Sequence, residues 1–499
     1  MTNFAKSWLA LAHPLAARPV RVVGIAALLL LLPYAHPRGK AFRVIHAPWE
    51  KAEDTVELSS SKVVAEPVAS VGELGIGATE NKGSVTNALP EDRAQSEDAA
   101  KEAREKAGIT AKTEIEDPDG ALFPFFARLA VTEDAKKHPG PGSAGAVTRI
   151  VHYGDSVLTS DLISGTARRR FQERYGDSGH GFVLTANAWD WYFHNDVFHT
   201  ASDGWSMQRI VGPWADDGRY GPGGVSFTAT AGARATFGTA QKGEYGRNVG
   251  RFDIYYLEQP IGGELESVVE GGETARWTTR GPAKVTRVHS VRVADGAAKM
   301  QLFARGKARV FGVALERDQA GVVYDAMGIN GARAALLGDQ MNGDHWREIM
   351  DLRDPGLVIL NFGTNESEAG VLDPHYDDQL GKLIEKAKAA APNASVLVMS
   401  PIDRASKASG GELKTRKVIL DLVEAQRRLA HLHHVAFFDM FEAMGGKGSM
   451  ARWLKLSPPL GTADMTHPTP AGGEVLGNIL FAALERARER ATESEGARK

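Results

Sequence analysis

Two short segments far apart in the chain carry side chains that together could perform nucleophilic catalysis. Asp464 lies three residues before His467, and Ser156 follows an apolar, β-branched run. A serine hydroxyl is a poor nucleophile at neutral pH, so it needs a base such as imidazole to accept its proton while it attacks an ester carbonyl. A carboxylate then fixes the imidazole tautomer and stabilises the imidazolium that forms. Ser156, His467 and Asp464 are therefore a candidate catalytic triad.

The pattern around Ser156 indicates how it is positioned. Residues 147–153 predict a buried strand, and residues 157–175 predict a helix with apolar positions at helical spacing. Ser156 then lies at a strand-to-helix junction, where backbone N–H groups face a negative charge developing on a substrate oxygen. We expect Asp155 to cap or brace this turn rather than to react.

A second Gly-Asp-Ser sequence occurs at residues 176–178. It follows the predicted helix and runs into Gly-His-Gly, a pattern typical of a turn at a helix C-terminus. We therefore interpret Asp177 and Ser178 as turn formers.

Two further segments carry groups suited to an oxyanion site. Residues 357–362 predict a buried strand that runs into Gly-Thr-Asn-Glu, which places the amide of Asn365 at the carboxyl edge of a sheet. Residues 322–327 run into a glycine-rich turn at 328–331, where a Gly N–H allows close approach of a substrate. Glu366 is expected to hydrogen-bond a local loop rather than to act as a base.

In these segments the chain resembles the SGNH (GDSL-type) hydrolases, whose blocks supply Ser, Gly, Asn and His in that chain order. The resemblance implies an oxyanion hole formed by the N–H groups of Ser156 and Gly331 and the side chain of Asn365. It also implies a triad completed by Asp464 and His467 through the family's Asp-x-x-His pair.

Gly331 is chosen over Gly328 because residues 329–331 look like the family's small-polar-then-glycine step. The resembling segments lie within residues 149–477 and look most like bacterial peptidoglycan O-acetylesterases. The sequence departs from many of these at Val157, where they carry His directly after the serine.

The resemblance implies an esterase that removes O-acetyl groups from peptidoglycan or another envelope polysaccharide through an acyl-serine intermediate, without a metal or a cofactor. A polysaccharide O-acetyltransferase that uses the same triad is an alternative, and so is a non-catalytic glycan-binding scaffold. The sequence leaves open the acyl group, the glycan and the oligomeric state.

The composition and charge of the chain limit the classes of molecule that it is expected to bind. The chain has 499 residues, of which 43% are hydrophobic and 24% charged, as in ordinary globular proteins. Its formal net charge is −3, and it contains no long Lys/Arg stripe. A nucleic acid is therefore not an expected partner.

The N-terminal part predicts export. Residues 1–45 carry basic residues ahead of an apolar stretch at 22–35, which is shorter than the ~20 residues of a full membrane span. A cleaved signal peptide and an uncleaved anchor in the inner membrane both remain open, and either implies the periplasm or cell envelope. Residues 46–118 are polar and charged, and we interpret them as a flexible linker.

The rest of the chain predicts an α/β hydrolase domain interrupted by a β-rich insertion. Alternating strands and helices favour a three-layer parallel sheet built from residues 119–184 and 321–492, and the resemblance to the SGNH hydrolases implies the flavodoxin-like form of this sheet. Residues 185–320 show short alternating runs separated by glycines, typical of a β-sandwich. The helices expected after the insertion are 332–350, 376–390, 413–431 and 470–490; the sandwich strands expected include 225–229, 252–256, 285–293 and 300–315.

Aromatic residues concentrate in or beside the insertion: Trp189, Trp191, Tyr192, Trp205, Trp214, Tyr220 and Trp277. They can be sandwich core, or their exposed faces can stack on sugar rings. The histidines at 431–434 lack carboxylates or cysteines at ligand spacing, so no metal site is expected there. Residues 400–404 follow a predicted strand and could line the site, with no role assigned.

Overall fold

The computed structural model describes residue 109, residues 113–140 and residues 142–496. The predicted signal peptide or anchor at 1–45 and most of the predicted linker lie outside these residues. Among the described residues, no helix combines the length and apolar character needed to cross a membrane.

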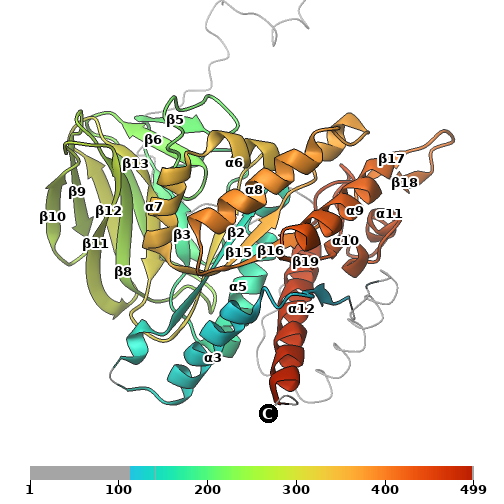
Figure 1. Ribbon diagram of the computed structural model, residues 1–499. Helices are drawn as coiled ribbons and strands as arrows, with labels where there is room; N and C mark the ends of the chain where they lie inside the picture. The colour runs from blue at the N-terminus through green and yellow to red at the C-terminus, as the bar shows by residue number, and fades with distance from the viewer. Residues whose placement is uncertain (1–108, 110–112, 141, 497–499) are drawn as a thin grey trace, which may run out of the picture. The chain divides into compact units, whose positions relative to one another are not determined.

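A six-stranded sheet forms the centre of the hydrolase domain (Figure 1). Its strands, in spatial order, are β1 (Ile115–Glu116), β19 (Ala436–Phe438), β16 (Ser395–Met399), β15 (Pro355–Asn361), β2 (Val147–Gly154) and β14 (Gly321–Gly328). From β19 to β14 all pairings are parallel. Taken in chain order, the parallel strands have the spatial order 2-1-3-4-5, which is the flavodoxin-like arrangement that we expected.

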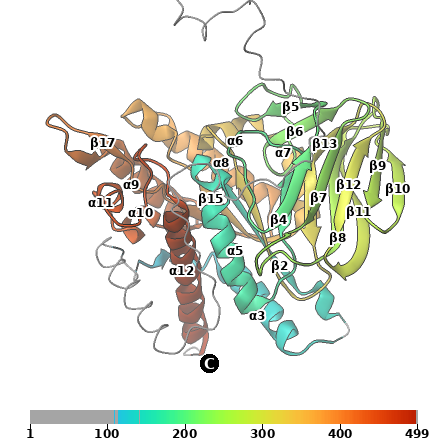
Figure 2. The same ribbon diagram turned by 180° about the vertical axis from the view of Figure 1, so that it is seen from behind.

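Helices cover both faces of this sheet, as Figures 1 and 2 show. The helices on one face are α3 (Phe123–Lys137), α5 (Leu162–Tyr175) and α12 (Pro470–Gly496); those on the other are α6 (Ala334–Gln340), α7 (Gly343–Arg353), α8 (Tyr376–Ala390) and α9 (Lys417–Leu432). Short helices α4 (Ser156–Thr159), α10 (Met440–Ala443) and α11 (Ser449–Trp453) and the 3-10 turns η5 (Ser143–Gly145) and η6 (Glu366–Ala369) lie in the connections.

Because helices cover both faces of the sheet, its strands are continuous runs of apolar residues and do not alternate between apolar and polar residues. Ile150 and Leu357 pack into one hydrophobic core, and their neighbours Val151 and Val358 pack into the other. Successive side chains of a strand point to opposite faces, and here both faces are buried. The second core continues into the β-rich insertion.

The insertion consists of two antiparallel sheets. One contains β10 (Thr274–Thr278), β9 (Glu264–Val269), β12 (Lys299–Ala304), β7 (Arg234–Thr239) and β4 (Val197–Ala201). The other contains β11 (Val285–Gly296), β8 (Val249–Glu258), β13 (Arg309–Glu316), β6 (Val225–Ala229) and β5 (Trp205–Arg209), with β3 (Gly181–Leu184) paired to β13. A small hairpin, β17 (Ala405–Lys407) and β18 (Leu413–Thr415), lies in the hydrolase domain.

Several boundaries differ from the sequence-based expectation. β1 lies within the predicted linker segment 46–118, where Ile115 is buried and pairs antiparallel with Phe438. β3 lies within the predicted first hydrolase segment 119–184 but pairs with a strand of the insertion. Both differences arise because the pairing partners are distant in sequence and leave no local signal.

Three predicted elements are divided. The expected helix at 157–175 breaks into α4 and α5 at Asp161, which has a left-handed φ of 53°. The expected helix at 332–350 breaks where the Asn342 side chain caps α7 by accepting from the His345 N–H. The expected strand at 300–315 is β12 and β13, and the expected helix at 413–431 begins only at Lys417. At Asn342 a polar side chain competes for a backbone group that a continuous helix would use, whereas at Asp161 the left-handed backbone itself ends the helical path.

A buried ion network joins the hydrolase sheet to the insertion. Arg353, at the end of α7, donates two hydrogen bonds of 2.9 Å to Asp325 on β14 and one of 2.7 Å to Glu316 on β13. Glu316 also accepts from Arg149 on β2 and Arg251 on β8. Arg353, Asp325 and Glu316 are each at most 1% exposed. Removing Arg353 would leave the Asp325 carboxylate buried without the cation that pairs with it, while Glu316 would keep Arg149 and Arg251.

We therefore expect Arg353→Met to lower the free energy of unfolding by about 3–5 kcal/mol. Arg347→Met on the same helix is the matched control, because Arg347 is exposed and its hydrogen bond within the described part of the chain goes to the Ala389 carbonyl oxygen. Its effect should stay within about 0.5 kcal/mol. Urea unfolding of both variants measures the difference. A loss below about 1 kcal/mol for Arg353→Met would show that the network does not stabilise the joint.

Candidate active site

Ser156 follows the carboxyl end of β2 and is the first residue of α4. The buried Asp155 carboxylate caps this helix by accepting from the Val157 N–H at 3.2 Å. Its other oxygen accepts from the Thr364 N–H at 3.0 Å, in the turn after β15. Asp155 therefore braces the serine turn, as expected, and also fixes it to the turn that carries Asn365.

The structure brings Ser156, His467 and Asp464 into one hydrogen-bonded chain. The Ser156 Oγ atom lies 2.8 Å from Nε2 of His467, although the two residues are 311 positions apart. The Nδ1 atom of the same imidazole lies 2.6 Å from Oδ2 of Asp464. With Nδ1 protonated and donating to Asp464, Nε2 is free to accept the serine proton.

Hydrogen bonds within the loop that carries Asp464 stabilise the ionised form of its carboxylate. Oδ1 of Asp464 accepts hydrogen bonds from the N–H groups of Thr466 and His467 and from the Thr462 hydroxyl. Partial burial opposes ionisation, but the hydrogen bonds from His467, Thr462 and the backbone hold the pKa of Asp464 well below its ordinary value. The Thr462 N–H also donates to the His467 carbonyl and closes the loop.

The glycine turn after β14 lies next to the serine turn. The Ile329 N–H donates to the Gly154 carbonyl at 2.9 Å, which extends the β2–β14 pairing to the residue before Asp155. Nδ2 of Asn365 donates to the Ala332 carbonyl at 2.8 Å. One N–H of the Asn365 amide is used in this bond, and the other can point to a substrate oxygen.

The structure distinguishes the two glycines of this turn. A Cβ added to Gly328 would lie 2.5 Å from the backbone nitrogen of Thr159, so Gly328 is packed against α4. Gly331 has a left-handed φ of 78°, and a Cβ there would meet no atom within 4 Å. Open space beside Gly331 is what a substrate needs, and this supports Gly331 as the candidate donor.

Glu366 is bound to the local backbone. Its Oε1 atom accepts from the Ala334 N–H at 2.8 Å, as expected, while its buried Oε2 atom has no hydrogen-bond partner. Burial raises the pKa of Glu366 to about 7, although the bond from Ala334 opposes the shift.

Arg404 is a positioning residue to which the sequence assigned no role. It follows β16, and its guanidinium donates to the Thr364 carbonyl at 3.0 Å and to the Ser367 hydroxyl at 2.9 Å, on the turn around Asn365. Its Nε atom donates to the Thr466 hydroxyl at 3.0 Å, on the loop that carries His467. One side chain therefore connects the oxyanion turn to the imidazole loop. The only sequence signal was its place after a strand at the carboxyl edge.

The second Gly-Asp-Ser copy has a structural role. The Ser178 hydroxyl donates to the Gln319 carbonyl at 2.6 Å, and Asp177 accepts from the Gly179 N–H and pairs with Arg317. These contacts lie at the start of β14, at the sheet edge opposite Ser156. They confirm Asp177 and Ser178 as turn formers.

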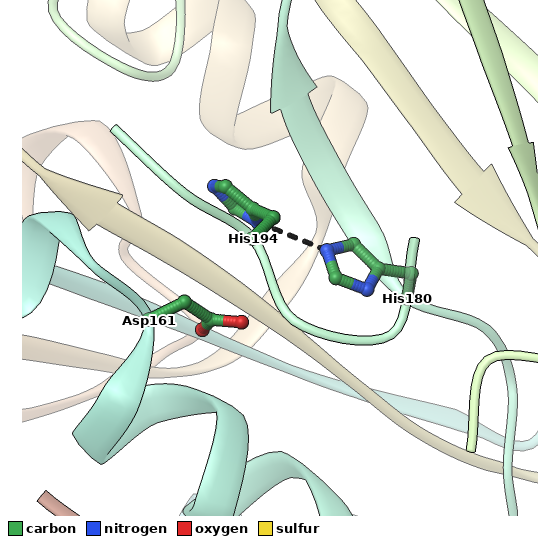
Figure 3. Close-up of side chains that lie close together, drawn as sticks. All are labelled: Asp161, His180 and His194. Carbon is green, nitrogen blue, oxygen red and sulfur yellow. Dashed lines mark hydrogen bonds between the residues drawn. The ribbon is translucent and has the colours of Figure 1, made fainter. Parts of the chain in front are cut away.

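Asp161, His180 and His194 have ligand atoms close enough to hold a metal ion (Figure 3). However, the two Asp161 oxygens already accept four hydrogen bonds, two from Arg168 and one each from Ser164 and the Asn195 N–H. A carboxylate has about four lone-pair sites, and the buried Arg168 cation opposes a second cation. His180 and His194 hydrogen-bond each other at 2.9 Å. These residues do not fit a metal ion.

The histidines at 431–434 point to separate carboxylates. His431, His433 and His434 pair with Glu116, Glu385 and Asp119, respectively. Each imidazole therefore has its own acidic partner, and the three do not converge on a common point.

The raised pKa of Glu366 predicts a pH-dependent stability. Between its ordinary value of 4.5 and about 7 the folded state binds the proton more tightly than the unfolded state, so this group's contribution to stability falls as pH rises through that window. Glu366→Gln, which stays neutral, should gain stability relative to wild type from pH 4.5 to pH 7. Urea unfolding at several pH values checks this, and a constant difference between the two proteins would contradict it.

The contacts of Arg404 predict a loss of serine reactivity without direct contact to Ser156. We expect Arg404→Ala to slow covalent labelling of Ser156 by a fluorophosphonate about tenfold, because a small misplacement of the imidazole is costly. Added guanidinium ion should restore part of the rate, which a purely structural defect would not allow.

Arg416→Ala is the matched control for Arg404→Ala. Arg416 donates to the Ser367 carbonyl on the oxyanion turn, and its partners do not include the His467 loop. Its labelling rate should change less than about twofold. Equal losses of labelling rate in the two variants would show that Arg404 does not act by connecting the oxyanion turn to the His467 loop.

The fold and part of the sequence are similar to those of known proteins. A peptidoglycan O-acetylesterase structure aligns with a TM-score of 0.62 and 20% identity, covering 75% of this chain and 99% of that protein. An acetylxylan esterase from Geobacillus stearothermophilus (17% identity, 32% of this chain, 72% of that one) and a family two carbohydrate esterase from Cellvibrio japonicus (10%, 59% and 98%) align with TM-scores of only 0.25. No curated protein sequence matches significantly.

The family model of the GDSL-like lipases and acylhydrolases matches residues 294–475. The matched segment contains Gly331, Asn365, Asp464 and His467. It begins within the insertion, in β11, and so does not include Ser156. Residues 294–475 are therefore similar to the GDSL-like lipases and acylhydrolases, and the fold is similar to that of a peptidoglycan O-acetylesterase.

Proposed function

We propose that the protein is a serine esterase that removes O-acetyl groups from a polysaccharide of the cell envelope, with peptidoglycan as the favoured substrate. The observation that carries this proposal is the hydrogen-bonded chain from Ser156 through His467 to Asp464, beside the open turn at Gly331. A hydroxyl, a base and an orienting carboxylate in this order are the requirements for acyl transfer through serine.

In the first half-reaction, Nε2 of His467 takes the proton of Ser156 as Oγ attacks the carbonyl carbon of the acetyl ester. The developing oxyanion would accept hydrogen bonds from the N–H groups of Ser156 and Gly331 and from the free N–H of Asn365. Collapse of this intermediate breaks the bond to the sugar oxygen, which leaves with the proton from His467. The product of this step is acetyl-Ser156.

In the second half-reaction, His467 removes a proton from water, whose oxygen attacks the acetyl-serine carbonyl. Release of acetate returns the proton to Ser156. Asp464 stays ionised throughout and stabilises the imidazolium, consistent with its lowered pKa.

The exposure of the triad favours hydrolysis over transfer to another sugar. The side chains of His467 and Asp464 are 38% and 50% exposed, so these two members of the triad are open to solvent. A transferase must keep water away from that intermediate while the acceptor hydroxyl attacks. The continuous triad also disfavours a scaffold that binds glycans without turnover.

The choice of substrate class draws on the fold shared with a peptidoglycan O-acetylesterase over three quarters of the chain. An envelope substrate agrees with the N-terminal sequence, and we propose that residues 1–45 export the enzyme or anchor it to the inner membrane. We do not expect a metal or a cofactor to take part.

Replacing the nucleophile tests the proposal. Ser156→Ala should reduce acetate release from acetylated peptidoglycan and hydrolysis of p-nitrophenyl acetate on the order of thousands-fold. Ser178→Ala is the control, because it alters the second Gly-Asp-Ser copy away from the site and should leave the rate per folded molecule unchanged. Undiminished turnover by Ser156→Ala would exclude the mechanism. Acetyl transfer to an added glycan in excess of acetate release would favour the transferase.

A further inference from the structure

The seven aromatic residues in or beside the insertion differ sharply in exposure. Trp205, Tyr192 and Tyr220 are buried, and Trp189 and Trp277 pack against the core. Trp191 and Trp214, by contrast, are 49% and 58% exposed. An exposed indole presents a large apolar face with a polar edge, and such side chains are enriched at binding surfaces.

Trp191 lies on the β3–β4 loop, which is attached to the serine helix. The Phe193 N–H, two residues further on, donates to the Thr159 carbonyl at 3.3 Å, and Thr159 is three residues after Ser156. Within the loop the Tyr192 hydroxyl accepts from the Leu184 N–H at 2.9 Å. The loop is therefore held against α4, close to the nucleophile.

Trp214 lies on the β5–β6 loop, which packs against the glycine turn. Its indole N–H donates to the Ile210 carbonyl at 3.2 Å, which fixes the ring edge while leaving the ring exposed. The Ile210 N–H donates to the Gly224 carbonyl, and a Cβ on Gly224 would lie only 2.7 Å from the Ile329 side chain. Ile329 is two residues before Gly331. Figures 1 and 2 show β5 and α6 along the same margin of the domain.

One side chain ties the two tryptophan loops together. Arg209 donates to the Ala188 carbonyl at 3.1 Å on the first loop and to the Gly212 carbonyl at 3.0 Å on the second. The loops are therefore neighbours, and both border the turns that carry Ser156 and Gly331.

The charged residues near the two tryptophans indicate which kind of ligand their indole rings could bind. Asp190, one residue before Trp191, and Asp216, two residues after Trp214, are both exposed. Their carboxylates can accept hydrogen bonds from sugar hydroxyls, and they repel anionic lipid headgroups and nucleic acids. A pyranose ring has apolar C–H faces and polar edges, so it suits an exposed indole with acidic residues nearby in the chain.

We propose that Trp191 and Trp214 form a sugar-stacking platform beside Ser156, which binds the rings next to the acetylated residue of a glycan chain. This inference rests on the proposed function for its choice of ligand, and it assigns the insertion a part in substrate binding. The platform holds the polymer so that one acetyl group enters the site. It contributes little to the binding of a small ester, which has no neighbouring sugar rings.

Binding without turnover tests the platform separately from catalysis. In the full chain carrying Ser156→Ala, titration calorimetry with an N-acetylglucosamine pentamer and with an acetylated xylopentaose should give binding to at least one of them. Trp191→Ala and Trp214→Ala should each raise that Kd about tenfold, while replacement by Phe retains most of the affinity.

Phe123→Ala is the matched control for these variants. Phe123 is also an exposed aromatic residue, at 46%, but it begins α3 near Ser395 at the opposite edge of the sheet. Its Kd should change less than twofold. Unchanged Kd values in both tryptophan variants, or no binding of either pentamer, would overturn the platform. Loss of binding to phosphatidylglycerol vesicles in the tryptophan variants, with sugar binding intact, would overturn it as well.

Turnover by the variants with an intact Ser156 separates this proposal from the proposed function. The loss of kcat/KM caused by each tryptophan replacement should be at least about fivefold larger on acetylated glycan than on p-nitrophenyl acetate. Equal losses on both substrates would contradict the platform. Failure of wild type to release acetate from any glycan would refute the proposed substrate while the pentamer titration still decides the platform.

Discussion

The candidate site depends on the register in which β2 lies between β14 and β15. Gly154 at the end of β2 pairs with Gly328 on one side and Asn361 on the other. The three strands therefore end at the same level, and the turns that follow carry Ser156, Gly331 and Asn365. Because β2 and β15 are the strands at which the chain changes direction across the sheet, this edge is where an open α/β sheet binds ligands.

Two short contacts extend that register from the strands into the turns. The Ile329 N–H donates to the Gly154 carbonyl, and the Asp155 carboxylate accepts from the Thr364 N–H. Both use backbone groups that would otherwise lack a partner after the last sheet hydrogen bond. The turns consequently have little freedom to move apart, which is the preorganisation that oxyanion stabilisation requires.

The large insertion does not disturb this arrangement. It follows α5 and ends at β14, which pairs with β2, the sheet strand that precedes α5. The buried ions of Arg353, Asp325 and Glu316 fix it to the sheet, and the hydrophobic core is continuous across the joint. Its loops can then border the catalytic edge without interrupting the parallel strands. An insertion at this point can add a surface next to the site without changing the register of the parallel strands.

The residue types, their local spacing and the resemblance to the SGNH hydrolases led to Ser156, Asn365 and the Asp464–His467 pair as candidates, and to the parallel sheet and the β-rich insertion. These features depend on periodicity and on side-chain chemistry, which are local properties of a sequence. The division of the helix at Asp161, the pairing of β1, the link through Arg404 and the exposure of Trp191 and Trp214 could not be predicted. Each depends on contacts between segments distant along the chain, and the sequence of one segment does not reveal which partner folding will place beside it.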